Sequence, residues 1–147
     1  MNQKPMLEPN TAFDPAADGW EQISNHTAFG DLVGPIWRKD ENRVPLFGFT
    51  VAPKHLNRAG NLHGGMLMTF ADQSMAMTAR VATGGKRHAT IELNTQFVGG
   101  VKIGEFVVSY PEVVRVTRSV VFMRATMFVG KRVVVTTNGI WKILDEG

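Results

Sequence analysis

Residues 61–79 read NLHGGMLMTFADQSMAMTA, and this stretch decides the fold. From residue 66 to residue 79 it is rich in Met, Ala and Leu and contains no Pro, which is typical of a helix that is buried on most sides. We expect the helix to run from about residue 65 to residue 82. It should end at Thr83-Gly84-Gly85, because glycine is the preferred residue just past a helix C-terminus.

Asp72 is the only charged residue between Gly64 and Ala79. A lone carboxylate in an apolar segment costs several kcal/mol unless it is compensated. No Lys or Arg lies three or four residues away along the helix. Asp72 is therefore either a surface acid that is solvated or paired with a distant Arg, or a group that lines a ligand cavity. We interpret it as functional.

His63-Gly64-Gly65 stands where a loop turns into the expected helix. The ordinary interpretation is a tight turn with His63 as a capping residue. The functional interpretation uses the same geometry, because N–H groups at a helix N-terminus are unpaired and residues without a Cβ let a carbonyl approach closely. Such a place meets the requirements of an oxyanion site for acyl transfer.

The spacing of the two features predicts how they are used together. Gly64 and Asp72 are eight residues apart, which places them about 12 Å from each other along one helix. If both act on one substrate, the simplest arrangement is a two-fold dimer in which Asp72 of one subunit approaches Gly64 of the other.

The rest of the chain predicts an α+β fold in a single domain of 147 residues. Residues 1–17 lack periodicity and are expected to form a loose arm. Residues 19–29 are expected to form a short helix. Residues 32–51 predict a hairpin that turns at 39–43, in which Pro35 and Pro45 mark edge or irregular strands. The C-terminal half contains four β-branched and aromatic runs, at 88–98, 105–117, 119–129 and 132–144.

The totals exclude several classes of function. The chain has no Cys, which rules out disulfides and Cys-ligated metals, and its four His residues show no metal-ligand spacing. No nucleophile elbow or phosphate-binding loop is present. The net charge is +3 with scattered cations, so nucleic acid is not an expected partner. Neither a signal peptide nor a long apolar run is visible, and we predict no membrane span and a cytoplasmic protein.

The segment NRAGNLHGG (57–65), followed by Asp72 and by Thr90, resembles the hotdog-fold acyl-CoA thioesterases. The branch that it resembles is the PaaI-like group of the 4-hydroxybenzoyl-CoA thioesterase superfamily, which includes acyl-CoA thioesterase 13. The similarity covers roughly residues 30–143, and the spacing N-x5-HGG-x6-D is more specific than HGG alone. It implies a long central helix wrapped by a curved antiparallel sheet, a homodimer, commonly a dimer of dimers, and active sites at the dimer interface.

The resemblance also implies roles for the matching residues. Asp72 corresponds to the catalytic acid, as nucleophile or as general base on water. Gly64 corresponds to the residue whose N–H polarises the thioester carbonyl. His63 and Asn57 match residues that orient the thioester and the attacking water, and Thr90 matches a hydroxyl residue that helps to hold that water.

Substrate contacts are expected around this group. Gly65 lies beside the polarising N–H, and helix residues are expected to line an acyl pocket whose Met-rich walls are adaptable. The phosphates of CoA would lie at the mouth of the site, where Arg suits phosphate oxygens, although these cations could equally be solvated turn residues. The predicted contacts are Gly65, Met68 and Met75 with Arg115 and Arg118, and Lys86 and Arg87 are further candidates for the phosphates.

We therefore predict an acyl-CoA thioesterase that hydrolyses aryl- or fatty-acyl-CoA to free CoA and a carboxylic acid. A thioester has a good leaving group, so a poised carboxylate and carbonyl polarisation suffice without metal or cofactor. One alternative is a hotdog hydratase or dehydratase, although its D-x-N-P-x-H motif is not found. The other is a non-catalytic acyl-CoA-binding protein. The sequence does not define the acyl group.

Overall fold

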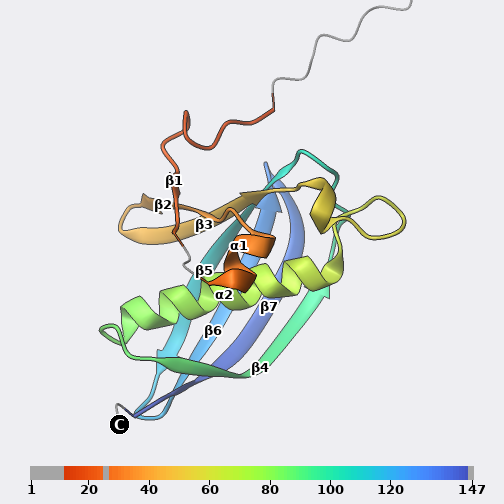
Figure 1. The fold of residues 1–147 in the computed structure, drawn as a ribbon. Coiled ribbons are helices and arrows are strands. Elements are labelled where there is room, and N and C mark those ends of the chain that lie inside the picture. The colour runs from red at the N-terminus through yellow and green to blue at the C-terminus, as the bar shows by residue number, and fades with distance from the viewer. Residues whose placement is uncertain (1–11, 25–26, 146–147) are drawn as a thin grey trace, which may run out of the picture.

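Helix α2 (Gly64–Ala82) lies in the concave face of a curved antiparallel sheet, as Figure 1 shows. The computed structural model describes residues 12–24 and 27–145, and in this part of the chain the sheet has seven strands in the order β1-β2-β3-β5-β6-β7-β4. The strands are β1 (Glu21–Gln22), β2 (Trp37–Glu41), β3 (Val44–Thr50), β4 (His88–Phe97), β5 (Phe106–Val116), β6 (Val120–Val129) and β7 (Arg132–Ile143). Helix α1 (Ala28–Val33) and the 3-10 turn η1 (Pro53–His55) complete the elements.

The bounds of α2 confirm the predicted helix to within one residue at its start. His63 is its N-cap and Thr83 is its C-cap. Gly84 and Gly85 follow the C-cap, and both have positive φ. Its core face repeats every three to four residues, as expected for a helix packed on a sheet. The buried positions are Met66, Leu67, Phe70, Ala71, Ser74, Met75, Thr78 and Ala79. No helix of the described residues is long and apolar enough to span a membrane.

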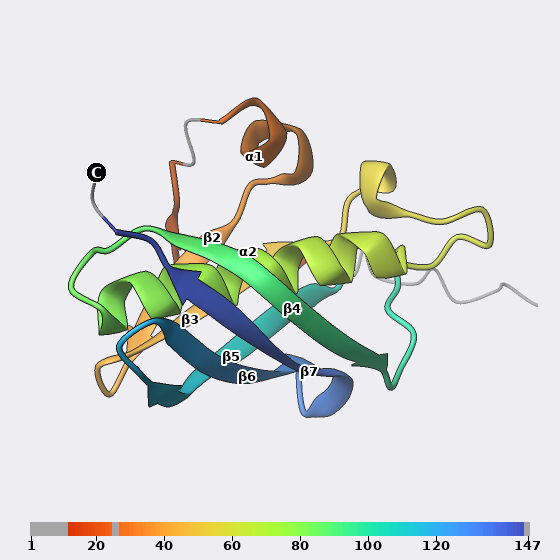
Figure 2. The same cartoon turned by 90° about the horizontal axis from the view of Figure 1, so that it is seen from below.

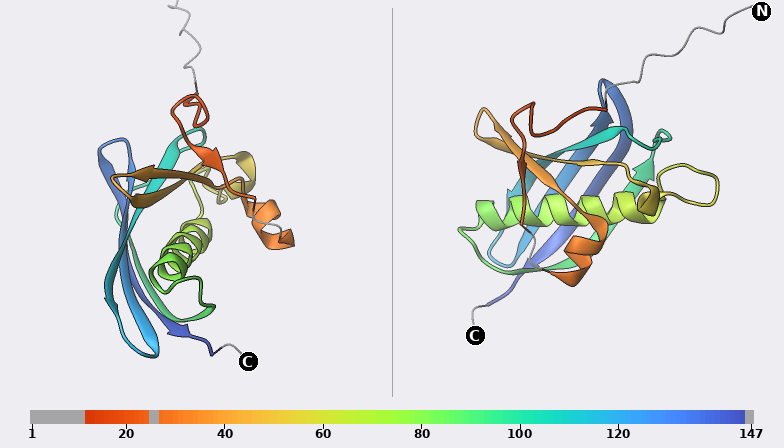
Figure 3. Two further views of the ribbon diagram at one scale, coloured as in Figure 1. Left: turned by 90° about the vertical axis from the view of Figure 1, so that its left-hand side faces the viewer. Right: turned by 45° about the horizontal axis from the view of Figure 1, so that its top comes forward.

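The core lies between α2 and the inner face of the sheet, and Figure 3 shows the sheet curving around the helix. Phe70 of α2 meets Phe49 of β3 edge to face at 4.7 Å, and Trp141 of β7 is 1% exposed. One polar pair interrupts this apolar core: the hydroxyls of Ser74 and Ser109 are 2.9 Å apart and both residues are fully buried. Packing of the helix face on the sheet confirms the α+β class.

The predicted hairpin and the four C-terminal strands are confirmed. Strands β2 and β3 turn at Asn42 and Arg43, which both have positive φ. Strand β3 lies inside the sheet rather than at its edge, because β5 pairs with it from Phe47 onward and leaves Pro45 beyond the paired segment. The expectation of an edge or irregular strand thus holds only for the end of β3 that contains Pro45, which pairs with β2 on one side alone.

The predicted helix over 19–29 is wrong. Residues 21–22 form β1 against β2, and the N–H of Ile23 donates to the Ile36 carbonyl at 2.8 Å, so backbone pairing replaces the helix. A helix begins only after Thr27, whose hydroxyl caps α1 by accepting from the N–H of Gly30. Of the predicted segment, residues 25–26 lie outside the described residues.

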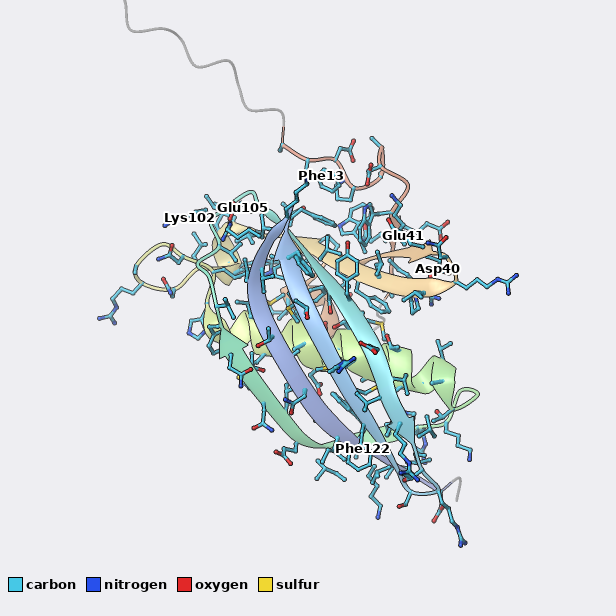
Figure 4. All side chains as sticks on the ribbon, turned by 180° about the vertical axis from the view of Figure 1, so that it is seen from behind. Phe13, Asp40, Glu41, Lys102, Glu105 and Phe122 are labelled. Atoms are coloured by element: carbon cyan, nitrogen blue, oxygen red, sulfur yellow. The ribbon has the colours of Figure 1, made fainter. Side chains whose placement is uncertain are left out.

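The predicted loose arm covers residues 1–17, of which 1–11 lie outside the described residues. Residues 12–17 are mostly exposed, and Phe13 among them contacts the outer face of the sheet. The ring centroids of Phe13 and Phe106 lie 4.7 Å apart in a tilted arrangement, and the N–H of Trp20 donates to the carbonyl of the buried Pro15. Figure 4 shows Phe13 above this outer face, opposite α2. Trp20, Leu46 and Phe106 form a small second cluster there.

Candidate active site

Asp72 and Thr90, two of the predicted site residues, are joined directly. The Thr90 hydroxyl donates a hydrogen bond of 2.6 Å to Oδ1 of Asp72. Asp72 is half-buried in the middle of α2, and Thr90 is exposed on the edge strand β4. Among the described residues, no cation forms an ion pair with Asp72. The carboxylate is thus held by a hydroxyl and remains available to a ligand.

A β-bulge in β4 brings Thr90 to this position. Thr90 pairs with Trp141 and Glu92 with Ile140, so Ile91 is the extra residue. On the far side of the bulge, Leu93 packs against the core and so faces α2 as well. Uninterrupted alternation would place Thr90 and Leu93 on opposite faces, since their numbers differ by an odd count. The bulge therefore turns Thr90 toward Asp72, in keeping with the frequent occurrence of bulges beside functional sites.

The N-terminus of α2 is organised by His63. Its Nδ1 accepts a hydrogen bond of 2.8 Å from the N–H of Gly65, and its own N–H donates to the His55 carbonyl at 2.8 Å. Among the described residues, the N–H of Gly64 has no acceptor. Of the two glycine N–H groups after the cap, only that of Gly64 is therefore open to a ligand.

The two glycines lie close to different neighbours. A Cβ on Gly65 would lie 2.9 Å from Nδ1 of His63, so a side chain there would displace the cap. A Cβ on Gly64 would lie 3.2 Å from the ring of Phe97, the last residue of β4, which is 54% exposed. Strand β4 thus touches both Asp72, through Thr90, and the helix N-terminus, through Phe97.

Asn57 holds the loop in front of α2 in shape. Its side-chain oxygen accepts from the N–H groups of Ala59 and Asn61 at 3.0 and 3.1 Å. Its own N–H donates to the Asn61 carbonyl at 2.7 Å, and Gly60 completes the turn with φ +79°. The Asn57 oxygen is occupied by the backbone, so within one chain this side chain builds the loop.

His55, which the sequence did not mark as functional, ties this region together. The residue is 4% exposed, its Nδ1 accepts from the N–H of Ala52 at 3.0 Å, and its Nε2 lies 2.7 Å from the carbonyl of Val33 in α1. These contacts correspond to a neutral ring that accepts at Nδ1 and donates at Nε2. Burial lowers the pKa of His55, Lys54 lowers it further, and the bond to Val33 opposes both. Because its carbonyl holds His63, His55 links α1 to the start of α2.

The remaining predicted residues are not gathered at Asp72 within one chain. Met68 is 36% exposed on α2, whereas Met75 is fully buried in the core. Arg115 pairs with Phe122, so it lies on the outer face of the sheet that Figure 4 displays, away from α2. Arg118 lies exposed in the turn between β5 and β6.

The predicted site residues thus include two groups on one helix, which we call half-sites. One is Asp72 with Thr90, and the other is the Gly64 N–H with its His63 cap. Gly64 and Asp72 both belong to the continuous helix α2, eight residues and about 12 Å apart. Among the described residues, no group of His, Asp or Glu is arranged to hold a metal ion.

Comparison with known proteins places this chain in a family. The sequence profile of the thioesterase superfamily matches residues 59–136, just over half of the chain and the part that contains both half-sites. A Caenorhabditis elegans protein named as a candidate esterase, F42H10.6, is 33% identical over 104 residues. That match covers 70% of this chain and 62% of the worm protein's length.

Two solved structures show the same fold. Thioesterase superfamily member 2 of zebra fish superposes with a TM-score of 0.75 at 19% identity, covering 82% of this chain and 89% of that one. Protein BH2602 of Bacillus halodurans, solved with CoA, has a TM-score of 0.67 at 18% identity and covers 75% and 74% of the two chains. The long helix wrapped by an antiparallel sheet is therefore the hotdog fold. By its sequence match, this chain belongs to the thioesterase superfamily.

Proposed function

We propose that the protein hydrolyses acyl-CoA thioesters, so that water and the thioester become a carboxylic acid and the free thiol of CoA. The observation that carries this proposal is the Asp72 carboxylate, which has a hydroxyl donor and no cationic partner among the described residues. Family membership supports the thioester chemistry. The presence of CoA in the BH2602 structure, a protein of the same fold, supports CoA as the carrier.

In the proposed reaction, the Gly64 N–H polarises the thioester carbonyl and stabilises the negative charge that develops on its oxygen. Asp72 acts on the carbonyl carbon, either by direct attack or by taking a proton from water. Thr90 fixes the orientation of the carboxylate and helps to hold the attacking water. His63 uses Nδ1 for the cap, which leaves Nε2 to orient the thioester.

We further propose that each active site is shared by two subunits. A single chain cannot bring Gly64 and Asp72 to one carbonyl, because the rigid helix keeps them about 12 Å apart. Strand β4 ends the sheet, and Figure 2 shows it running beside α2 at that edge. An unpaired edge is a surface for strand pairing, and Ile91 is 57% exposed on it. Pairing of two β4 edges around a two-fold axis would set the two α2 helices side by side, and such dimers would pair again into tetramers.

The test is hydrolysis of a panel of short, medium, long and aromatic acyl-CoA esters by purified protein, followed by release of thiol. Asp72→Asn should lower the rate at least about 100-fold, the usual contribution of a general base, while the oligomer is kept. Asp31→Asn, a substitution of an exposed acid on α1, is the matched control. Unchanged hydrolysis by Asp72→Asn would refute the role of this residue. Loss of conjugation in an enoyl-CoA, without release of thiol, would indicate a hydratase instead.

A further inference from the structure

A pocket beside the C-terminal half of α2 has no role in the reaction described so far. Its volume is about 400 Å³. The helix, the turn that follows it, the start of β4 and the segment after β7 all contribute to its walls. The lining residues are Ala76, Met77, Arg80, Lys86, Arg87, His88 and Leu144.

The pocket concentrates positive charge that no ion pair among the described residues neutralises. Arg80, Lys86 and Arg87 all line it, and none forms an ion pair with a carboxylate of the described residues. Asp145 directly follows Leu144 and is likewise outside every ion pair in this part of the chain. The pKa of His88 is lowered, first by burial and then by the charge of Arg80. Arg80 is therefore close enough to His88, which also lines the pocket, to disfavour the protonated form of its ring.

The pocket adjoins the half-site that contains Asp72. Ala76 is one helical turn beyond Asp72, and His88 is two residues before Thr90 on β4. Arg80 is two turns beyond Asp72, about 12 Å along the helix axis. A ligand whose reacting carbonyl lies at Asp72 can thus extend along α2 and reach the cations with its distant end.

Stability of the helix accounts for only one of these cations. A cation in the last turn is favoured by the helix dipole, and Arg80 is such a residue. Lys86 and Arg87 lie beyond the helix and bring two further charges to the same cavity, which raises the repulsion among them. Repulsion of this kind is relieved when an anion binds, and Arg is well suited to phosphate and carboxylate oxygens.

Resting on the proposed thioesterase function, we propose that this pocket binds an anionic group of the thioester substrate. The apolar side chains of Met77 and Leu144 accommodate the chain that leads to the anion, and the three cations bind its oxygens. Two parts of a substrate have this chemistry: the phosphates of CoA, and a carboxylate at the far end of the acyl group. Arg115 lies on the opposite face of the sheet, so it is not needed to bind the anionic group in the pocket of its own chain.

The two sources are separated by three thioesters. Butyryl-CoA carries only the phosphates, succinyl-pantetheine only the carboxylate, and butyryl-pantetheine neither. In the double variant Arg80→Gln/Arg87→Gln, kcat/KM should fall at least about tenfold for the substrate that carries the recognised anion, as expected for lost charge-assisted hydrogen bonds. Hydrolysis of butyryl-pantetheine should change less than about twofold. Lys131→Gln, a substitution of an exposed cation in the β6–β7 turn, is the matched control and should behave like the parent.

An equal loss on all three thioesters, or no loss on any, overturns the proposal. If kcat/KM of the double variant falls selectively for butyryl-CoA, the pocket binds phosphate. If it falls selectively for succinyl-pantetheine, the pocket binds a carboxylate. If the parent protein hydrolyses no thioester, the proposed function has failed, and the pocket is tested by calorimetric binding of free CoA and of succinyl-pantetheine. Weaker binding by the double variant than by Lys131→Gln then supports the pocket, and equal or absent binding overturns it.

Discussion

The Thr90 hydroxyl donates to Oδ1 of Asp72 at 2.6 Å and so fastens the edge strand β4 to the middle of α2. Because the acceptor is a carboxylate and no cation competes for it among the described residues, this bond controls where the carboxylate points. The same strand reaches the start of the helix through Phe97 and Gly64. One strand therefore contacts both half-sites of the chain.

Replacement of Thr90 tests this positioning. Thr90→Val keeps the shape of the side chain but removes the donor, so kcat should fall about tenfold, in line with the loss of a hydrogen bond to a charged group. Thr90→Ser keeps the hydroxyl and should retain most of the activity. Steady-state kinetics of the two variants give the comparison. Equal rates for Val and Ser would show that the hydrogen bond does not contribute to the reaction.

Subunit complementation tests the shared site. Homo-oligomers of Asp72→Asn and of Gly65→Val should both be inactive, since each variant lacks one half-site in every active site. In a mixed dimer with the proposed shared sites, the Asp72 of one chain would meet the intact helix N-terminus of the other. Random pairing after co-expression should then restore about a quarter of the parental activity. Absence of recovery in isolated mixed dimers would show that one chain supplies the whole site.

Gly65→Ala tests the His63 cap. The new Cβ would lie 2.9 Å from Nδ1 of His63, so the imidazole must move and the Gly65 N–H loses its acceptor. Stability should change little, because the gain in helix propensity of about 1 kcal/mol offsets the lost cap. The rate should fall about tenfold to 100-fold through misplacement of the half-site. Gly100→Ala is the control, since nothing lies within 4 Å of its Cβ.

The buried hydroxyl pair of Ser74 and Ser109 predicts a stability cycle. Ser74→Ala leaves the Ser109 hydroxyl without its partner and should destabilise the fold by about 1–3 kcal/mol. Ser109→Ala should cost less, because Ser74 still donates to the Ala71 carbonyl at 3.3 Å. The double Ala variant should be more stable than Ser74→Ala alone. Urea unfolding measures all three, and additive losses would contradict the coupling.

The buried His55 predicts a loss of stability in acid. Its folded-state pKa is lowered from 6.5, so below about pH 6.5 the unfolded chain binds more protons than the folded one. The free energy of unfolding should therefore decrease as the pH falls below that value, and should be flat above it. His88 shifts in the same direction. In His55→Gln, the free energy of unfolding should depend less on pH than in the parent. In His88→Gln, the contribution of His55 to this dependence should remain. An unchanged pH profile of stability in His55→Gln would exclude His55 as the source.

Strong periodic segments of the fold could be predicted from the sequence. The apolar face of α2 and the glycines after it define the helix, and the β-branched runs define β4 to β7. Residues 19–29 could not be predicted, because Trp20 and Ile23 have a spacing that also suits a helix. Their structure is decided by distant partners: Trp20 packs on Phe106, and Ile23 bonds to Ile36.

The candidate site was predictable in part. Asp72 is conspicuous as a single charge in an apolar helix, but its contact with Thr90 depends on a bulge that no local pattern announces. Met75 was expected at the ligand and lies in the core, because its position on the helix faces the sheet. His55 has no periodic or motif-based mark, and its importance follows only from its contacts with Val33 and Ala52.

The two contacts of β4 have a consequence for regulation by concentration. Thr90 and Phe97 belong to β4, whose free edge is proposed to join the subunits. The same strand would therefore form the subunit interface and contact the proposed active site. Dilution below the dissociation constant of such a dimer would separate the half-sites that act together in one active site. The specific activity of an enzyme built in this way would depend on its own concentration, since the activity per chain rises with the number of chains present.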